Sequence, residues 1–207
     1  GIILGKTATT EFGWTGASTS RVFGNGRTPW DPRLTSGGSS SGSAIAVAAR
    51  MVPAALGSDG GGSVRIPSAF CGTFALKGTL GRIPTWPWSA TEMLSHAGPI
   101  TRTVRDTVTF FEEAERVRRN RKLPAIGVSA NPELERPLHV GVMVDSPFAP
   151  PSDADTRAAV EGAAKLLGEL GHHVEEWEPN IPASFQEDFL DYWAFLAYNT
   201  AAGGKRL

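Results

Sequence analysis

Two clusters of glycine and serine constrain the fold of this chain more than any other feature. Residues 37–43 read GGSSSGS and residues 60–63 read GGGS, and the segment between them is rich in alanine and branched apolar side chains. Flexible linkers lack such apolar surroundings, so a linker does not explain the two clusters. Because glycine permits conformations that other residues disfavour, we expect tight turns on either side of a buried segment.

Apolar spacing predicts both helices and strands. Helical spacing occurs in four segments: residues 43–52, 103–117, 154–170 and 185–198. Short apolar runs typical of strands occur in four others: residues 2–4, 71–76, 138–144 and 172–177. Pro53 should end the first helix, and the proline-containing segment 82–95 should be irregular. The strand–helix–strand order near the end predicts neighbouring parallel strands, and the aromatic residues of 185–198 should form a buried stripe.

The composition is that of a globular protein with an ordinary core. The chain is 41% hydrophobic and 20% charged, with a net charge of −1, so its charge gives no reason to expect binding to nucleic acid. The basic segment 116–122 has no interleaved aromatic residues and reads as a solvated helix end. No apolar run reaches the roughly 18 residues of a membrane helix, and the single Cys71 excludes an intrachain disulfide. We therefore expect a cytoplasmic protein without nucleic-acid or membrane partners.

The two ends of the chain suggest a piece of a longer domain. The sequence starts without methionine on an apolar run, and it stops at NTAAGGKRL without a clear terminal element. We expect residues 1–207 to form a single, incomplete domain. Within it, residues 1–100 carry the glycine and serine clusters, and residues 101–207 continue with the strand–helix–strand unit.

The segment SDGGGSVRIPS around the second cluster has the groups that acyl transfer requires. Ser63 offers a hydroxyl nucleophile on a constrained turn, and the amides before it can converge on a developing oxyanion. Asp59 and Arg65 flank the turn and can form a charge-assisted pair across it. A purely structural glycine turn explains the local sequence equally well. A phosphate-binding loop is disfavoured because the Lys-Ser/Thr ending of a P-loop is missing.

A serine nucleophile needs a base, and no histidine is marked as one. His139, His172 and His173 lie in or beside predicted strands and read as structural. His96 is nearest to Ser63 in sequence, but nothing local marks it as a base. A lysine acting through an intermediate hydroxyl is the other known arrangement. No cluster of His, Cys and Asp suggests a metal, and we expect no cofactor.

Several long segments match one known pattern. They are GKTATTEFG, PWDPRLTSGGSSSGSAIAVAARMVPAALGSDGGGSVRIPSAFCGTFALKGTLGRIP, GPITRTVRDT, VGVMVDSP and ADTRAAVEGAAKLLGELGHHVEEWEP. The most specific feature is the separation of 24 residues between Ser39 in GGSSSG and Ser63 in GGGS. On these residues the chain resembles the amidase signature family of serine hydrolases. The resemblance implies an α/β fold with a mixed central sheet flanked by helices, truncated here at both ends.

The resemblance also implies a role for each matching residue. Ser63 is similar to the family's nucleophile, and Ser39 resembles the serine that follows a cis peptide and relays a proton. Cys71 is then a packed small residue. The oxyanion donors fall on the amides of the turn, namely Gly60, Gly61, Gly62 and Ser63. The supporting residues around the site are Asp59, Arg65 and Ser40.

The family's base is a lysine well upstream of the GKT segment, and the resemblance implies that it is missing from this chain. Lys6 and Lys77 match framework positions of the family instead. Two departures from the pattern are Ser41, where glycine is common, and Gly78, where proline is common. The first affects the freedom of the serine-rich loop.

The function implied by the resemblance is hydrolysis of a carboxamide C–N bond through an acyl-serine intermediate, without cofactor or metal. The substrate would be a small-molecule amide, and a homodimer is left open. Two alternatives remain: a subunit of a glutamine-dependent amidotransferase, and an inert fragment or pseudoenzyme, which the missing lysine favours for the chain as given.

Overall fold

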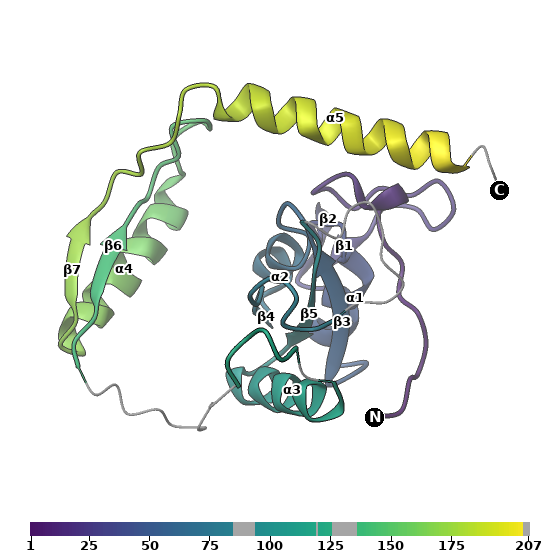
Figure 1. Cartoon of the computed structure of the whole chain (residues 1–207), viewed down its shortest axis with the longest axis horizontal. Coiled ribbons are helices and arrows are strands. Elements are labelled where there is room, and N and C mark those ends of the chain that lie inside the picture. The colour runs from purple at the N-terminus through teal and green to yellow at the C-terminus, as the bar shows by residue number, and fades with distance from the viewer. Residues whose placement is uncertain (85–93, 119, 126–135, 205–207) are drawn as a thin grey trace. The chain divides into compact units, whose positions relative to one another are not determined.

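The computed structural model of the chain describes residues 1–84, 94–118, 120–125 and 136–204 (Figure 1). It divides into two compact units, one of Gly1–Asn131 with Asn199–Leu207 and one of Pro132–Tyr198. Both contain helices and strands, which confirms the α/β class. Strands pair antiparallel in the first unit and parallel in the second, so both senses occur, but in separate sheets instead of one central sheet. That the chain is a single domain stays a prediction.

The first unit is built on a three-stranded antiparallel sheet. Its strands are β3 (Ala54–Asp59), β5 (His96–Thr101) and β4 (Phe74–Ala75), with β5 in the middle. A cluster of buried side chains packs beside this sheet: Ala44, Val47, Ala48, Val64, Cys71 and Ile100. These come from the alanine-rich segment that follows the first cluster, from the end of the glycine turn and the helix after it, and from β5, so the core holds together the segments next to the two sequence clusters.

Three helices cover this sheet. Helix α1 (Ser41–Ala48) packs on β3 and β5, α2 (Arg65–Cys71) packs on α1 and β4, and α3 (Val104–Val117) packs on β5 and β4. The small side chains of α1 allow close packing. The Arg102 guanidinium donates to the Val47 carbonyl in the last turn of α1 at 3.2 Å and to the Val52 carbonyl after the helix at 2.8 Å. The predicted helix at residues 103–117 is confirmed. A helix is also present in the predicted segment 43–52, but it begins at Ser41 and ends at Ala48, well before Pro53, and Arg50 just beyond it has φ of 60°.

Serine hydroxyls close the outer edge of β3. The Ser43 hydroxyl donates to the Leu56 carbonyl at 2.9 Å, and the Ser40 hydroxyl accepts from the Ser58 amide at 3.2 Å and donates to the Ser58 carbonyl at 3.4 Å. These are backbone groups that a neighbouring strand would otherwise bind. The serine-rich cluster therefore holds the strand that leads into the glycine turn.

Two predictions for the first unit are wrong in detail. Residues 2–4 form no strand, and their side chains are exposed, because no strand lies beside them among the described residues. Cys71 belongs to the end of α2, and only Phe74–Ala75 of the predicted strand 71–76 is extended. Gly72 ends α2 in a left-handed conformation, with φ of 64°, which delays the strand.

The remaining elements of this unit are short. A 3₁₀ turn, η1 (Glu11–Gly13), precedes the small antiparallel pair β1 (Arg27–Thr28) and β2 (Asp31–Thr35). Most of the segment 82–95, for which the sequence predicts irregular structure, lies outside the described residues.

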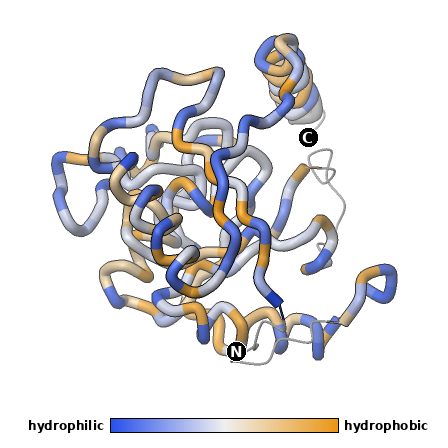
Figure 2. The backbone as a smooth tube through the Cα atoms, turned by 90° about the vertical axis from the view of Figure 1, so that its left-hand side faces the viewer, coloured by the Kyte–Doolittle hydropathy of each residue, from blue (hydrophilic) through white to orange (hydrophobic). Residues whose placement is uncertain are grey.

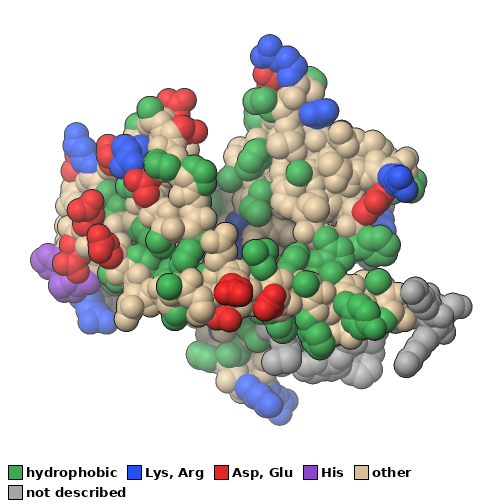
Figure 3. Space-filling view, turned by 90° about the horizontal axis from the view of Figure 1, so that it is seen from above, with side chains coloured by type: hydrophobic (Ala, Val, Ile, Leu, Met, Phe, Trp, Pro, Cys, Tyr) green, Lys and Arg blue, Asp and Glu red, His purple; other side chains and the backbone are tan. Residues whose placement is uncertain are grey.

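The second unit contains the predicted strand–helix–strand arrangement. Strands β6 (His139–Val142) and β7 (His173–Glu176) are parallel and paired in register, with α4 (Ala154–Glu169) between them in sequence. The Asp153 carboxylate caps α4 by accepting from the Thr156 amide at 2.7 Å. Histidine side chains gather on the surface of this unit (Figure 3), where the rings of His139 and His173 lie 4.9 Å apart.

Helix α5 (Phe185–Gly204) follows, and hydrophobic and hydrophilic residues alternate around it (Figure 2). The rings of Phe185, Phe189 and Trp193 stack along one side with centroids 6.2 and 5.6 Å apart. Phe185 and Phe189 remain exposed, so the buried aromatic stripe predicted for this helix is not observed. Among the described residues, no helix has the length and apolarity needed to cross a membrane.

Candidate active site

The glycine cluster at residues 60–63 forms the turn between β3 and α2. Gly62 has φ of +123°, a conformation that side-chain-bearing residues rarely adopt. A Cβ atom added there would lie 2.7 Å from Ile66 Cδ1. The positive φ therefore favours glycine at position 62, and a side chain there would also force the end of the Ile66 side chain to shift.

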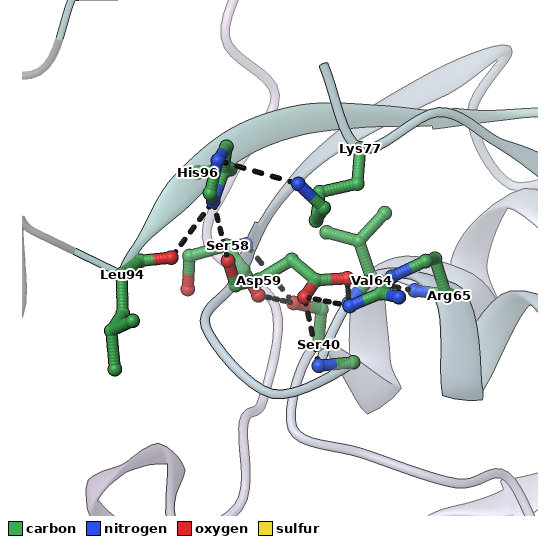
Figure 4. A network of polar contacts seen from close by, with 9 residues as sticks. Ser40, Ser58, Asp59, Val64, Arg65, Lys77, Leu94 and His96 are labelled. Atoms are coloured by element: carbon green, nitrogen blue, oxygen red, sulfur yellow. Dashed lines mark hydrogen bonds and ion pairs between the residues drawn. The ribbon is translucent and has the colours of Figure 1, made fainter. Parts of the chain in front are cut away.

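The Asp59 carboxylate holds this turn from inside (Figure 4). Its side chain is 1% exposed and accepts five hydrogen bonds. Three come from the amides of Gly62, Val64 and Arg65 at 2.8, 3.2 and 3.3 Å. The other two come from Nε and Nη2 of the Arg65 guanidinium, at 3.0 and 2.9 Å. The predicted Asp59–Arg65 pair is confirmed, and it also orders the backbone of the turn.

These contacts decide the charge of the carboxylate. Burial alone would raise the pKa of Asp59, but hydrogen bonds from the Arg65 guanidinium and from the Val64 and Gly62 amides outweigh it, so the pKa lies below its ordinary value. The hydrogen bonds that the Arg65 guanidinium donates to Asp59 raise the pKa of Arg65. Both groups are therefore ionised at neutral pH, and the pair is a fixed part of the turn.

One of the amides predicted to bind the oxyanion already has a hydrogen-bond acceptor within the turn. The Gly62 amide donates to Asp59 Oδ1 and is not available to a ligand in this arrangement. No described residue accepts a hydrogen bond from the amides of Gly60, Gly61 or Ser63. Three N–H groups of one turn are thus left for an acceptor such as an oxyanion.

The two candidate catalytic serines lie in adjoining segments. The Ser40 amide donates to the Ser63 carbonyl at 3.1 Å, which joins the serine-rich cluster to the glycine turn. The Gly38–Ser39 peptide is cis, as expected for this position. Ser39 is buried and Ser63 is half-buried. The two hydroxyls make no hydrogen bond to each other, so the contact between the two segments is made by the backbone.

Residues 8–13, which precede the first cluster, lie beside Ser39. The Thr10 amide donates to the Ser39 carbonyl at 3.2 Å, and the Gly42 amide donates to the Ala8 carbonyl at 3.0 Å. A Cβ atom added at Gly13 would lie 3.5 Å from the Ser39 hydroxyl oxygen. Residues 8–13 therefore lie against the backbone around Ser39, with Gly13 nearest to its hydroxyl, a position that the sequence alone does not predict for them.

The structure also brings in two residues that sequence reasoning sets aside. His96 pairs with Asp59 across β3 and β5, and its ring contacts Lys77 (Figure 4). Neither is a candidate from sequence, because the pairing of β5 with both β3 and β4 brings together residues that are far apart along the chain. Cys71 is fully buried, and burial raises the pKa of its thiol, which disfavours the reactive thiolate and agrees with a packing role.

Replacing Gly62 with alanine should destabilise the turn. We expect the free energy of unfolding to fall by about 1–3 kcal/mol, because the new Cβ meets Ile66 and the backbone has positive φ. Gly60→Ala is the matched control, since a Cβ there has no neighbour nearer than 3.9 Å. Urea unfolding of the two variants would contradict this explanation if both lost the same stability.

Comparison with known proteins identifies the family. The family model for amidases matches residues 1–203. The chain belongs to the amidase family. It is 42% identical over 208 residues to the protein named "Putative amidase AmiC" of Mycobacterium tuberculosis, a match that covers 99% of this chain and 44% of that protein. The serine and glycine clusters thus lie in a chain whose amidase relatives align with almost all of it.

Two further proteins extend the comparison. One subunit of the glutamyl-tRNA(Gln) amidotransferase of Halorhodospira halophila is 38% identical over 188 residues, covering 87% of this chain and 38% of that protein. The structure of a 6-aminohexanoate cyclic dimer hydrolase complexed with substrate has a TM-score of 0.74 and 34% identity, covering 86% of this chain and 39% of that one. The chain thus spans less than half the length of these relatives.

Within the described part of the chain, no group of three or more His, Cys, Asp or Glu side chains is placed to hold a metal ion. The polar groups that converge on this amidase turn are backbone amides, serine hydroxyls and the Asp59–Arg65 pair. This set suits the binding of a negatively charged oxygen, because its free groups are donors.

Proposed function

We propose that the protein hydrolyses a carboxamide through an acyl-enzyme intermediate on Ser63. The observation that carries the proposal is the turn itself: Ser63 lies among three amides without an acceptor in the described structure, and a buried carboxylate fixes the backbone around them. Membership of the amidase family supports the same chemistry. Donors fixed in advance at the site of the oxyanion are a large source of transition-state stabilisation.

In the proposed reaction the Ser63 hydroxyl oxygen attacks the amide carbon and loses its proton through the Ser39 hydroxyl to a neutral lysine. The family resemblance assigns this lysine to a position outside residues 1–207. The amides of Gly60, Gly61 and Ser63 bind the tetrahedral oxyanion. The proton then passes to the leaving nitrogen, the C–N bond breaks, and an acyl-serine remains. Water attacks this ester by the same proton path and releases the carboxylic acid.

A second candidate function is the glutaminase step of an amidotransferase, in which the ammonia passes to a partner's substrate. The likeness to one subunit of a glutamyl-tRNA(Gln) amidotransferase favours it. It predicts glutamine as the preferred substrate and a stable complex with another protein. A purified protein that hydrolyses simple aryl amides without a partner would count against it.

The proposal also covers the substrate, the cellular location and the assembly of the protein. We propose a small-molecule amide as substrate, a cytoplasmic location, and a homodimer as the simplest assembly. Light scattering of the purified protein measures the last of these.

Covalent labelling tests the proposed nucleophile. The complete natural polypeptide that contains this chain, incubated with a fluorophosphonate probe, should carry the probe on Ser63, as located by peptide mass spectrometry. Residues 1–207 alone should be labelled weakly, since a serine without its base is a poor nucleophile. Absence of labelling at Ser63 in the complete polypeptide would contradict the proposal. Strong labelling of residues 1–207 alone would contradict the assigned position of the lysine.

A further inference from the structure

The carbonyl that begins the glycine turn has a specific partner. Nδ1 of His96 lies 3.2 Å from the Asp59 carbonyl oxygen and 2.8 Å from the Leu94 carbonyl oxygen (Figure 4). Two carbonyl oxygens can only accept hydrogen bonds, so Nδ1 carries a hydrogen that both share. The imidazole therefore links the end of β3 to the chain that enters β5.

The other ring nitrogen is held as well. Lys77 Nζ lies 3.3 Å from His96 Nε2. An ammonium group is a donor without acceptor capacity, so Nε2 must accept and cannot carry a hydrogen itself. Lys77 thus selects the tautomer in which Nδ1 is the donor. Both side chains are half-buried, which limits competition from water for these contacts.

Fixing this carbonyl also fixes an amide of the turn. The Asp59 carbonyl and the Gly60 amide belong to one planar peptide, and in a trans peptide the C=O and N–H bonds point in opposite directions. A rotation of the peptide that moved the carbonyl away from His96 would turn the Gly60 N–H with it. The Asp59 side chain restrains the turn only from Gly62 onward, so nothing in the carboxylate cluster orients this first peptide.

We propose that His96, held in its Nδ1–H tautomer by Lys77, is a positioning residue that keeps the Gly60 N–H directed at the oxyanion. The inference rests on the proposed amide hydrolysis. It gives His96 no contact with substrate and no proton to transfer. It also gives Lys77 a role that differs from that of the family's base, because its ammonium acts on the imidazole.

The test compares His96→Ala, His96→Asn and Lys77→Met in the complete natural polypeptide, with His172→Ala and Lys165→Met as matched controls from the second unit. An asparagine amide can place its nitrogen near the position of Nδ1 and donate to the same carbonyl. We expect His96→Ala to lower kcat for an aryl amide about 10–100-fold with KM changed less than about threefold, since the loss is indirect and one oxyanion donor is worth about 10²–10³. His96→Asn should restore most of the lost kcat, and Lys77→Met should lower kcat less than His96→Ala does. Both controls should keep the wild-type kcat.

A second readout separates positioning from a general loss of structure. Affinity for an aryl boronic acid, which forms a tetrahedral anionic adduct on an active serine, should fall by the same factor as kcat in His96→Ala. Affinity for the carboxylic acid product should change little. Either of two results would overturn the proposal. One is an equal loss of affinity for both ligands in His96→Ala that His96→Asn does not restore. The other is a kcat for His96→Ala within twofold of the wild-type value. If the wild-type protein forms no adduct at Ser63, the amide hydrolysis itself is wrong, which is a different result.

Discussion

Replacing Ser63 with alanine should lower kcat for amide hydrolysis by at least about 10⁴-fold while leaving the folded state intact. The magnitude follows from enzymes in which removal of a serine nucleophile leaves only binding and oxyanion stabilisation. The half-buried Ser63 side chain makes no hydrogen bond with any described residue. Its loss should therefore change the free energy of unfolding by less than about 1 kcal/mol.

Ser39→Ala should cause a loss of similar size, because the proposed proton path runs through this hydroxyl. The double variant should be little worse than either single one, since residues that act as a unit are not additive. Ser58→Ala is the matched control, because this neighbouring serine has an exposed side chain. Steady-state kinetics with an aryl amide give kcat for the two single variants, the double variant and the control. A wild-type kcat for Ser39→Ala would show that Ser39 does not relay the proton, and it would not affect the role proposed for Ser63.

Replacing Asp59 with asparagine should lower the free energy of unfolding by about 3 kcal/mol. The carboxylate is 1% exposed and accepts from three amides and a guanidinium, so both of its oxygens are used. Asparagine has one such oxygen, and its amide nitrogen would face donors. Activity should fall as well, because the turn that carries Ser63 loses its anchor.

Asp31→Asn is the control for this prediction. Like Asp59, Asp31 pairs with an arginine: Nη2 of Arg33 lies 2.7 Å from Asp31 Oδ2. The Arg33 side chain is 88% exposed, however, and this pair lies on the surface. Its loss should cost far less stability than the loss of the Asp59 carboxylate, because solvent screens an exposed ion pair. Urea unfolding of both variants would contradict the role of burial if their losses were equal.

The Asp59 contacts also predict how stability depends on pH. Folding lowers the pKa of Asp59, so the folded protein binds fewer protons than the unfolded chain in acid. The contribution of this carboxylate is fully present above the pKa of about 3.9 that it has in the unfolded chain, and it is lost as the pH falls through the lower pKa of the folded state. The stability difference between wild type and Asp59→Asn should therefore shrink in acid. A difference that stays constant over this range would show that the charge is not responsible.

Some elements could be predicted from local sequence, and others could not. Helix α3 and the β6–α4–β7 unit follow from apolar spacing because each element carries its own periodic signal. Local sequence does not predict strands β3 and β5, because they contain Gly57, Gly98 and Pro99, which disfavour strands. They are stabilised by pairing with each other, with Gly57 opposite Gly98 and Leu56 opposite Pro99. Pro99 is tolerated in this middle strand because β4 pairs only with Ile100 and Thr101.

The sequence by itself indicated which residues are candidates for the chemistry. The glycine turn with Ser63 and the Asp59–Arg65 pair are recognisable from residue types and short spacings, because a tight turn and a nearby ion pair depend on close neighbours in the chain. Ser39 becomes a candidate only through the resemblance to the amidase signature family. Only the tertiary structure decided how the amides of the turn are used. Asp59 takes the Gly62 amide, and His96 and Lys77 arrive from separate segments to hold the Asp59 carbonyl. Each hydrogen bond depends on where folding places a donor and its acceptor, and no local spacing encodes that position.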